Sequence, residues 1–279
     1  MTSIVPFRLF QHLPLVEVTL DGFRQETFIF DTGIGLTVVS DSVLRELGHS
    51  PSGKMHVGHR MTGQEIAAPL SELNQLSLGG HSQARPVVGS FDLSRFPLEK
   101  EIPGGFLSLT FFERTAATLD FTTQELTLVD SGSLMDPDSW GTPVSAIVKR
   151  EGPETEVFLE LQLPNGRRVK AEVDTGSDTL FLNSKFMDEL GVSAGGPGVL
   201  ESRGTDDFGR PFVQYRTQLT GPVCVAANSS FAQQSPKVIF ADLIYDAVVG
   251  FDFLRTFRVT FDIAGSTLSF AGAAGARHG

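Results

Sequence analysis

Short runs of alternating apolar and polar residues predict β-strands along most of the chain. The segments 15–20 (LVEVTL) and 158–163 (FLELQL) alternate with a period of two, as half-buried strands do. Two other segments, 40–48 (SDSVLRELG) and 183–191 (NSKFMDELG), each read as a cap residue, a short amphipathic helix and a terminating glycine. We therefore predict a mostly β protein with one or two short helices in each half.

The predicted elements recur in the same order in the two halves of the chain. Residues 15–48 align with 158–191 without a gap at an offset of 143, and residues 118–128 align with 260–270 at an offset of 142. An offset that holds to within one residue across most of each copy predicts an internal repeat. We divide the chain into an N-terminal half (1–130), a linker (131–143), a C-terminal half (144–270) and a flexible tail (271–279).

Composition and charge narrow the classes of function. The 279 residues are 41% hydrophobic and 20% charged, which suits a globular chain with a sizeable core. A net charge of −11 without a Lys/Arg-rich run argues against a nucleic-acid partner. No secretory signal and no apolar run of about 20 residues is visible, so we expect no membrane association and a cytoplasmic location. The single cysteine, Cys224, is interpreted as a small buried hydrophobe and suits a reducing compartment.

The repeated unit is built around Asp-Thr-Gly, at 31–33 and at 174–176. In such a turn the Asp accepts backbone N–H groups and the Gly lets the chain pass close to another group. A single copy is typical of an ordinary surface turn, whereas two copies that each follow a strand and precede a short helix indicate a functional pair. Two carboxylates about 3 Å apart cannot both ionise readily, so such a pair holds one shared proton and can serve as both acid and base.

These residues resemble the aspartic protease superfamily, in its pepsin and retropepsin branches. The resemblance rests on Phe30-Asp31-Thr32-Gly33 with the apolar run at 36–39, and on Val173-Asp174-Thr175-Gly176-Ser177 with the run at 180–182. A late hydrophobic-hydrophobic-Gly segment, which pairs with the Asp loop in this superfamily, is present at 248–254; the first half has Ser108 in place of that glycine, at 106–112. The short halves without cysteine pairs are more similar to two fused retropepsin-type domains than to a secreted pepsin.

The resemblance implies an all-β fold of two pseudo-twofold-related closed β barrels of the acid protease fold, with short helices. It implies an aspartic-type endopeptidase that hydrolyses polypeptide substrates between large apolar side chains. Fusion of the halves already supplies the partner that retropepsin-type domains need, so we expect a monomer. The chemistry requires neither a metal nor an organic cofactor.

The same resemblance assigns roles to individual residues. Asp31 and Asp174 are the expected catalytic pair and hold the nucleophilic water between them. The expected supporting residues hydrogen-bond the opposite loop, leave space for the substrate backbone or donate to the carboxylates; they are Thr32, Gly33, Thr175, Gly176 and Ser177.

Two polar, Gly-containing hairpin tips are candidate flaps over a substrate, at 58–66 (GHRMTGQEI) and 204–212 (GTDDFGRPF). The candidate substrate-binding residues there are Met61, Thr62, Gly63, Phe208 and Gly209, and a solvated hairpin without substrate contact remains an equal alternative. Neither tip has the Tyr that pepsins place in the flap. His56 and His59 form an H-x-x-H spacing without another obvious ligand nearby, so we predict no metal site.

One position breaks the symmetry of the repeat. Ser177 follows the second motif glycine, whereas Ile34 follows the first, where this superfamily commonly has Ser or Thr. A hydroxyl at this position can donate to the outer carboxylate oxygen and favour the ionised form. We therefore predict that Asp31 is the more readily protonated partner; the alternative is that Ile34 only packs in the core and water replaces the hydroxyl.

Two other classes of function remain open. A catalytically silent module could hold an extended peptide in the same cleft by β-augmentation. Ile34 and Ser108 favour it weakly, and two intact Asp-Thr-Gly loops argue against it. The third class is a structural protein that oligomerises through its barrel halves, for which a stable larger oligomer is expected.

Overall fold

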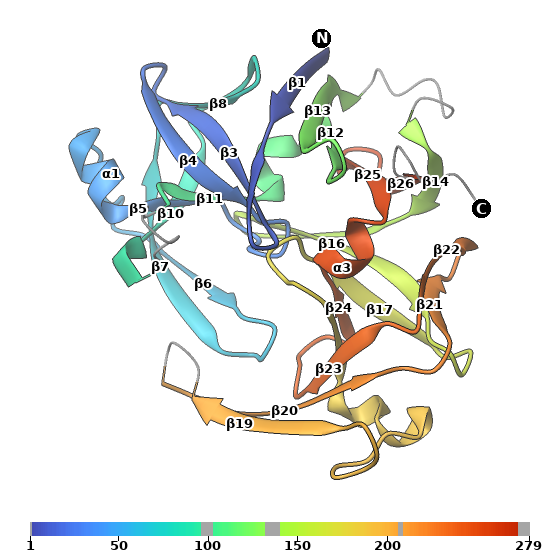
Figure 1. Cartoon of the computed structure of the whole chain (residues 1–279). Coiled ribbons are helices and arrows are strands. Elements are labelled where there is room, and N and C mark those ends of the chain that lie inside the picture. Colours follow the sequence, from blue (N-terminus) through green and yellow to red (C-terminus); the bar gives the residue numbers. More distant parts are fainter. Residues whose placement is uncertain (1, 96–102, 132–139, 206–208, 273–279) are drawn as a thin grey trace.

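The chain folds almost entirely into β-strands in a computed structural model, which describes residues 2–95, 103–131, 140–205 and 209–272. In Figure 1 the N-terminal half, blue to green, lies mainly at the upper left, and the C-terminal half, yellow to red, lies mainly at the right and below. The few helices are short, so the predicted all-β class is confirmed.

Each half contributes a ten-stranded sheet, and the two sheets have equivalent strand orders. The first runs β6 (Met55–His59), β7 (Glu65–Glu72), β10 (Val87–Phe91), β5 (Val38–Ser40), β11 (Gly105–Leu107), β4 (Arg24–Phe30), β3 (Leu13–Leu20), β8 (Gln75–Leu78) and β9 (His81–Ala84), with β2 (Arg8–Phe10) paired to β3. The second runs β19 (Leu200–Thr205), β20 (Pro211–Gln218), β23 (Lys237–Ala241), β18 (Leu180–Asn183), β24 (Ala247–Val249), β17 (Arg168–Val173), β16 (Glu154–Gln162), β21 (Pro222–Val225) and β22 (Asn228–Gln234), with β15 (Ile147–Glu151) paired to β16. Every strand of the first sheet thus has a counterpart in the second, as an internal repeat requires. Each order is a path with two ends, so closure into barrels stays a prediction.

A third sheet of six strands joins the halves. Its order is β1 (Thr2–Pro6), β13 (Glu125–Asp130), β12 (Thr115–Asp120), β25 (Phe257–Asp262), β26 (Thr267–Gly272) and β14 (Thr142–Ser145). At its centre β12 pairs antiparallel with β25, where Thr118 lies opposite Thr260 and their hydroxyl oxygens are 2.8 Å apart. The repeated segments 118–128 and 260–270 are therefore neighbouring hairpins of one sheet. This sheet was not foreseen in the sequence.

The edges of the predicted linker and tail take part in the same sheet. β14 begins at Thr142, inside the predicted linker, and β26 ends at Gly272, inside the predicted tail. Residues 132–139 of the linker and 273–279 of the tail lie outside the described residues.

The predicted helix of the first half is present as α1 (Asp41–Glu46), which follows Ser40 and precedes Gly48. The helix predicted for the second half is instead two 3₁₀ turns, η4 (Ser184–Phe186) and η5 (Asp188–Leu190). The backbone hydrogen bonds of these turns join residues three apart rather than four apart, as between the Met187 amide and the Ser184 carbonyl. In the part of the chain that the structure describes, the other short helices are η1 (Leu93–Arg95), η2 (Leu109–Phe112) and α3 (Phe251–Leu254).

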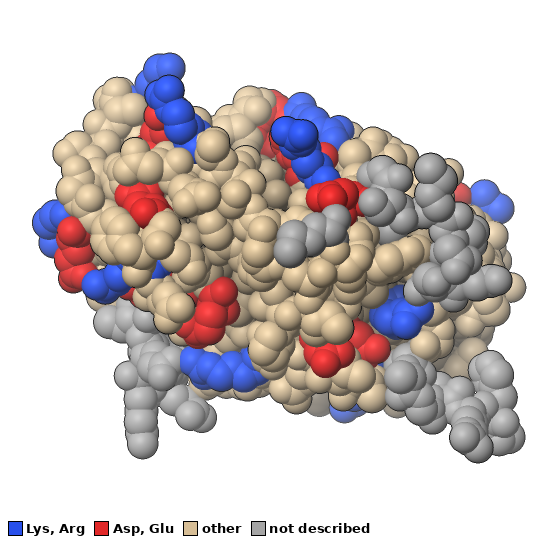
Figure 2. Space-filling view, turned by 90° about the horizontal axis from the view of Figure 1, so that it is seen from above, with Lys and Arg blue, Asp and Glu red and all other residues tan. Residues whose placement is uncertain are grey.

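The hydrophobic core is continuous between the halves. Phe30, which precedes the first motif Asp, packs its ring edge against Phe112 of its own half and Phe261 of the other, at centroid distances of 5.4 and 6.4 Å. The prediction that Cys224 is a buried hydrophobe is confirmed, because it is free and 6% exposed. The described helices include none long and apolar enough to cross a bilayer. On the face shown in Figure 2, basic and acidic side chains of the described residues are interspersed, without a continuous basic patch.

Candidate active site

The two Asp-Thr-Gly loops occupy equivalent places in the two sheets. β4 leads into Asp31 and lies parallel to β11, and the Asp31 amide donates to the Leu107 carbonyl at 3.0 Å. β17 leads into Asp174 and lies parallel to β24, and the Asp174 amide donates to the Val249 carbonyl at 3.0 Å. Both late hydrophobic segments therefore pair with an Asp loop, as the sequence predicted.

Buried hydrogen bonds join the two loops across the halves. The Thr32 hydroxyl donates to the Val173 carbonyl at 2.6 Å and accepts from the Thr175 amide at 3.1 Å. The Thr175 hydroxyl donates to the Phe30 carbonyl at 2.8 Å and accepts from the Thr32 amide at 3.1 Å. Both threonines are fully buried. The four bonds fix the position of one loop relative to the other, and they thereby fix the positions of the two carboxyl groups that the loops carry.

The motif glycines place the carboxyl groups against one another. The amides of Gly33 and Gly176 donate to the Asp of their own loop, at 2.9 and 2.8 Å. A Cβ atom at Gly33 would overlap the Asp174 carboxyl, and one at Gly176 would overlap that of Asp31. These glycines therefore make room for the opposite carboxyl as well as donating to their own.

The surroundings of the two carboxyl groups are asymmetric. Burial, followed by the negative charge of Asp174, raises the pKa of Asp31 well above its ordinary value, against the opposing hydrogen bond from the Gly33 amide. Ser177 Oγ donates to Asp174 Oδ2 at 2.6 Å. Ile34 holds the equivalent position in the first loop, lines the cleft and has no hydroxyl to donate. Which of the two carboxyl groups holds the shared proton stays a prediction.

The carboxyl pair opens into a cleft of about 330 Å³ lined by both halves. Its walls differ in polarity. The N-terminal half supplies a mostly apolar wall that includes Ile34, Leu36, Val38, Ile66, Ala68 and Phe106. Apart from Gly176, the C-terminal half supplies polar and acidic side chains, namely Glu154, Glu172, Asp174, Ser177 and Tyr245.

The first candidate flap is the hairpin of β6 and β7, and it reaches the C-terminal half. Met61 lines the cleft, and its carbonyl accepts from the Ile244 amide at 2.8 Å. Met61 also packs against a buried cluster that includes Leu243. Thr62 and Gly63 form the tip beside it without lining the cleft, and Gly63 has a φ of +78°.

The second candidate flap, β19 and β20, has no described residue in the lining of this cleft. Gly209 lies in the turn of that hairpin, and Phe208 lies outside the described residues. The two hairpins are equivalent in topology, but of the predicted flap residues that the structure describes, only Met61 lines the cleft.

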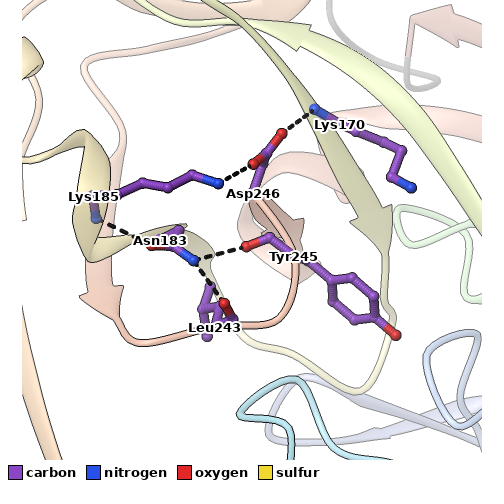
Figure 3. Close-up of polar contacts among 6 residues, drawn as sticks. All are labelled: Lys170, Asn183, Lys185, Leu243, Tyr245 and Asp246. Atoms are coloured by element: carbon purple, nitrogen blue, oxygen red, sulfur yellow. Dashed lines mark hydrogen bonds and ion pairs between the residues drawn. The ribbon is translucent and has the colours of Figure 1, made fainter.

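The loop that receives the first flap is held by polar contacts (Figure 3). Asn183 donates its amide group to the carbonyls of Leu243 and Tyr245 at 2.6 and 3.2 Å, and Lys185 pairs with Asp246 at 2.6 Å. The Tyr245 side chain extends away from these groups, and its hydroxyl donates to Glu156 Oε1 at 2.8 Å. Burial raises the pKa of Tyr245, so this phenol stays protonated at neutral pH.

His56 and His59 take part in separate contacts rather than a shared one. His56 Nε2 lies 2.7 Å from Glu154 Oε1, and His59 Nε2 lies 3.9 Å from Glu65. Among the described residues, no group of three or more His, Cys, Asp and Glu side chains is arranged to hold a metal ion.

Ser108 is built into its surroundings. Its hydroxyl lies 3.1 Å from that of Thr37 and 2.8 Å from that of Thr110, and it accepts from the Thr110 amide at the start of η2. At Gly250, the equivalent position of the second half, a Cβ atom would overlap the carbonyl oxygens of Ser177 and Thr179. Glycine is therefore required in the second half only.

Comparisons with known proteins agree with this geometry. A family model described as aspartyl protease matches residues 16–111, about a third of the chain, and supports a relationship to aspartyl proteases. The fold is similar to that of a solved structure described as "Crystal structure of edgp", with a TM-score of 0.57 and 11% identity over 98% of this chain and 95% of that one. A search of curated proteins found no match. The two halves thus share an overall fold with a protein of very different sequence.

Several groups near the carboxyl pair were missed in the sequence. His12 Nε2 donates to the Gly176 carbonyl at 2.9 Å from the opposite half, and no sequence pattern marks that contact. Glu172, in contrast to His12, could have been noticed in the sequence. It is an acid two residues before Asp174, and the equivalent residue of the first copy is Ile29. An acid within a strand that otherwise reads as buried is a signal that comparison of the copies could have revealed.

Proposed function

We propose that the chain is an aspartic endopeptidase that hydrolyses peptide bonds with a water molecule activated between Asp31 and Asp174. The observation that carries this proposal is the contact of two carboxyl groups, one from each half, at a cleft, with the pKa of Asp31 raised by burial and by Asp174. The family match at residues 16–111 supports the same assignment. In this proposal the halves are two fused retropepsin-type barrels that act as a monomer, without a cofactor.

The proposed chemistry divides the work between the carboxyl groups. Asp174, which receives the Ser177 hydroxyl and the Gly176 amide, accepts a proton from water as the water oxygen bonds to the scissile carbonyl carbon. Protonated Asp31 donates its proton to the carbonyl oxygen. The tetrahedral intermediate then breaks its C–N bond as the departing nitrogen takes up the proton from Asp174 and one hydroxyl group of the intermediate returns a proton to Asp31. This step leaves a carboxylic acid, an amine and the pair with one proton again.

The test is cleavage of a mixed peptide library from about pH 3 to pH 8, with fragments read by mass spectrometry. We expect the wild-type chain to cut and the variants Asp31→Asn and Asp174→Asn not to cut. Asp178→Asn is the matched control, because Asp178 is an exposed acid four residues after Asp174. Cuts that persist in either dyad variant contradict the shared mechanism. A folded wild-type chain that binds peptides without cutting them indicates the silent peptide-binding module, which the missing hydroxyl at Ile34 favours.

A further inference from the structure

Glu172 is a buried acid at a position where the first half has a buried apolar residue. Glu172 is 3% exposed, and its counterpart Ile29 is 2% exposed and packs with Leu15 and Phe106. In each strand a motif Asp follows two residues later. The acid is therefore a property of one wall of the cleft only.

The alternation of β17 directs Glu172 to the same side as Asp174. Val169, Ala171 and Val173 lie in the hydrophobic core, so the residues between them lie on the opposite face. Both Glu172 and Asp174 line the cleft. Residues two apart in a strand are separated by roughly 6.5 Å, which is about two residues of an extended substrate. Glu172 is thus placed beside the reacting centre rather than in it.

The Glu172 carboxyl has no hydrogen bond or ion pair with any residue that the structure describes. The neighbouring acids differ in this respect. Glu156 accepts from the Tyr245 hydroxyl at 2.8 Å and lies 3.2 Å from Lys149 Nζ, and Glu154 is paired with His56. A buried carboxyl without a donor is costly, and a donor that enters from the cleft removes this cost.

The surroundings of Glu172 favour a positive charge. Burial raises the pKa of Glu172, and the nearby negative charges raise it further. The titratable groups near it include Asp31, Asp174, Glu156, Tyr245 and the cation Lys149. His56, His59 and Arg60 also line the cleft, from the N-terminal half. The negative potential that disfavours ionisation of Glu172 stabilises a cation placed against it, and the bound cation in turn favours release of the proton from Glu172, so that a charge pair forms.

We propose that Glu172 is a specificity-determining residue that binds a Lys or Arg side chain next to the scissile bond, and that the apolar wall takes a large apolar side chain on the other side of that bond. The proposal rests on the proposed peptidase function. It replaces the sequence-based expectation of apolar residues on both sides. The apolar subsite is assigned to Leu36, Val38, Ile66 and Phe106, which line the cleft from the N-terminal half.

Four octapeptides test the proposal, with Leu-Lys, Leu-norleucine, Lys-Leu or norleucine-Leu at the centre. Norleucine keeps the four-carbon stem of lysine and lacks the ammonium group. The peptides form two matched pairs, one with Lys or norleucine after Leu and one with Lys or norleucine before Leu. In one of these pairs we expect the wild-type chain to cleave the Lys peptide with a kcat/KM about tenfold or more above that of the norleucine peptide, an effect of the size that close charge pairs have at interfaces. Glu172→Gln is expected to bring this ratio close to one by slowing cleavage of the Lys peptide only.

The control is Glu160→Gln, which removes an exposed acid of the neighbouring strand that pairs with Arg168. It is expected to keep the wild-type ratio. Cleavage without a preference for Lys, or a preference that survives in Glu172→Gln, overturns the role of Glu172 and leaves the peptidase proposal intact.

A binding assay separates the two proposals if no peptide is cut. The same peptides are titrated by calorimetry into the Asp31→Asn chain with Glu172 intact and with Glu172→Gln. Tighter binding of a Lys peptide that depends on Glu172 supports the cation site even where the wild-type chain does not cleave, and then only the peptidase proposal fails. Equal binding or no binding of the Lys and norleucine peptides overturns the role of Glu172 whatever the cleavage assay shows.

Discussion

Ser177 donates its hydroxyl to Asp174 at 2.6 Å, and the equivalent position beside Asp31 is an isoleucine. The fold is otherwise nearly symmetric around the two carboxyl groups, since each accepts from the amide of its own motif glycine. The single hydroxyl therefore breaks the equivalence of two groups that sequence repetition made alike. We propose that the shared proton lies on Asp31, whose pKa is raised by burial and by the negative charge of Asp174.

Ile34→Ser tests this assignment. The introduced hydroxyl is expected to donate to Asp31 and favour its ionised form, which lowers the pKa of Asp31. Because catalysis needs one proton on the pair, the alkaline limb of kcat/KM moves to lower pH. The measurement is a pH–rate profile of wild type, Ile34→Ser and the size control Ile34→Ala. An alkaline limb that moves equally in both variants assigns the effect to lost bulk rather than to the hydroxyl.

Thr32→Val is expected to lower the stability of the whole chain. It orphans the buried Val173 carbonyl and Thr175 amide, and each unpaired buried group costs about 1–3 kcal/mol, so the free energy of unfolding falls by about 2–5 kcal/mol. Thr118→Val is the control, because its buried hydroxyl pairs only with the hydroxyl of Thr260 and its loss costs about 1 kcal/mol. Urea unfolding gives both values. Equal losses contradict a special role for the bonds between the loops.

Ser108 and Gly250 are expected to respond in opposite ways to an exchange of residue type. Ser108→Gly removes a helix cap and two hydroxyl contacts, which lowers stability by about 1–2 kcal/mol. Gly250→Ala forces a methyl group against two backbone carbonyls and costs about 3 kcal/mol. Thermal unfolding measures both. A gain of stability in Ser108→Gly would show that this serine is a defect in the loop rather than part of it.

Gly63→Ala is expected to weaken substrate binding through the flap. A Cβ atom there lies 2.8 Å from Ile244 Cγ2, so the tip must move from the loop that receives it, and KM rises several-fold with a smaller change in kcat. Gly53→Ala is matched, because Gly53 has the same backbone strain at a φ of +80° and no atom within 4 Å of an added Cβ. Steady-state kinetics of both variants decide the matter. A similar rise of KM in both assigns the effect to backbone strain alone.

The repeat predicted much of the fold because a residue offset is visible in one sequence. The strand that enters each Asp and the first flap hairpin follow from periodicity and turn residues. The pairing of 106–112 and 248–254 with the loops was implied by the resemblance to aspartic proteases. The six-stranded sheet could not be predicted, since β12 and β25 pair across some 140 residues and periodicity does not specify partners. The second helix was wrong in type because a nine-residue amphipathic pattern does not distinguish α from 3₁₀ turns.

The site was predictable as far as it is local. Asp31, Asp174 and Ser177 lie in motifs, and their contacts stay within or between those motifs. His12 and Tyr245 reach the site from distant turns, and no pattern marks them. The two candidate flap hairpins also differ in their tertiary contacts, which the sequence does not show. Met61 of the first hairpin contacts the loop at Ile244, whereas the described residues of the second hairpin do not line the cleft.

Glu172→Gln is expected to stabilise the folded chain at neutral pH and to leave its stability unchanged in acid. The folded chain keeps the proton on Glu172 above the ordinary pKa of 4.5, where the unfolded chain has lost it, because burial and Asp174 raise the folded-state pKa. Unfolding then releases a proton, so this residue lowers stability as pH rises from about 4.5 through its raised folded-state pKa. Glutamine cannot titrate and removes that loss.

Melting temperatures of wild type and variant at about pH 4 and pH 8 measure the difference in stability, with Glu160→Gln as the exposed control. The gap between variant and wild type should open with pH for Glu172 alone. A gap of the same size at both pH values would mean that the pKa of this carboxyl is the same in the folded and the unfolded chain.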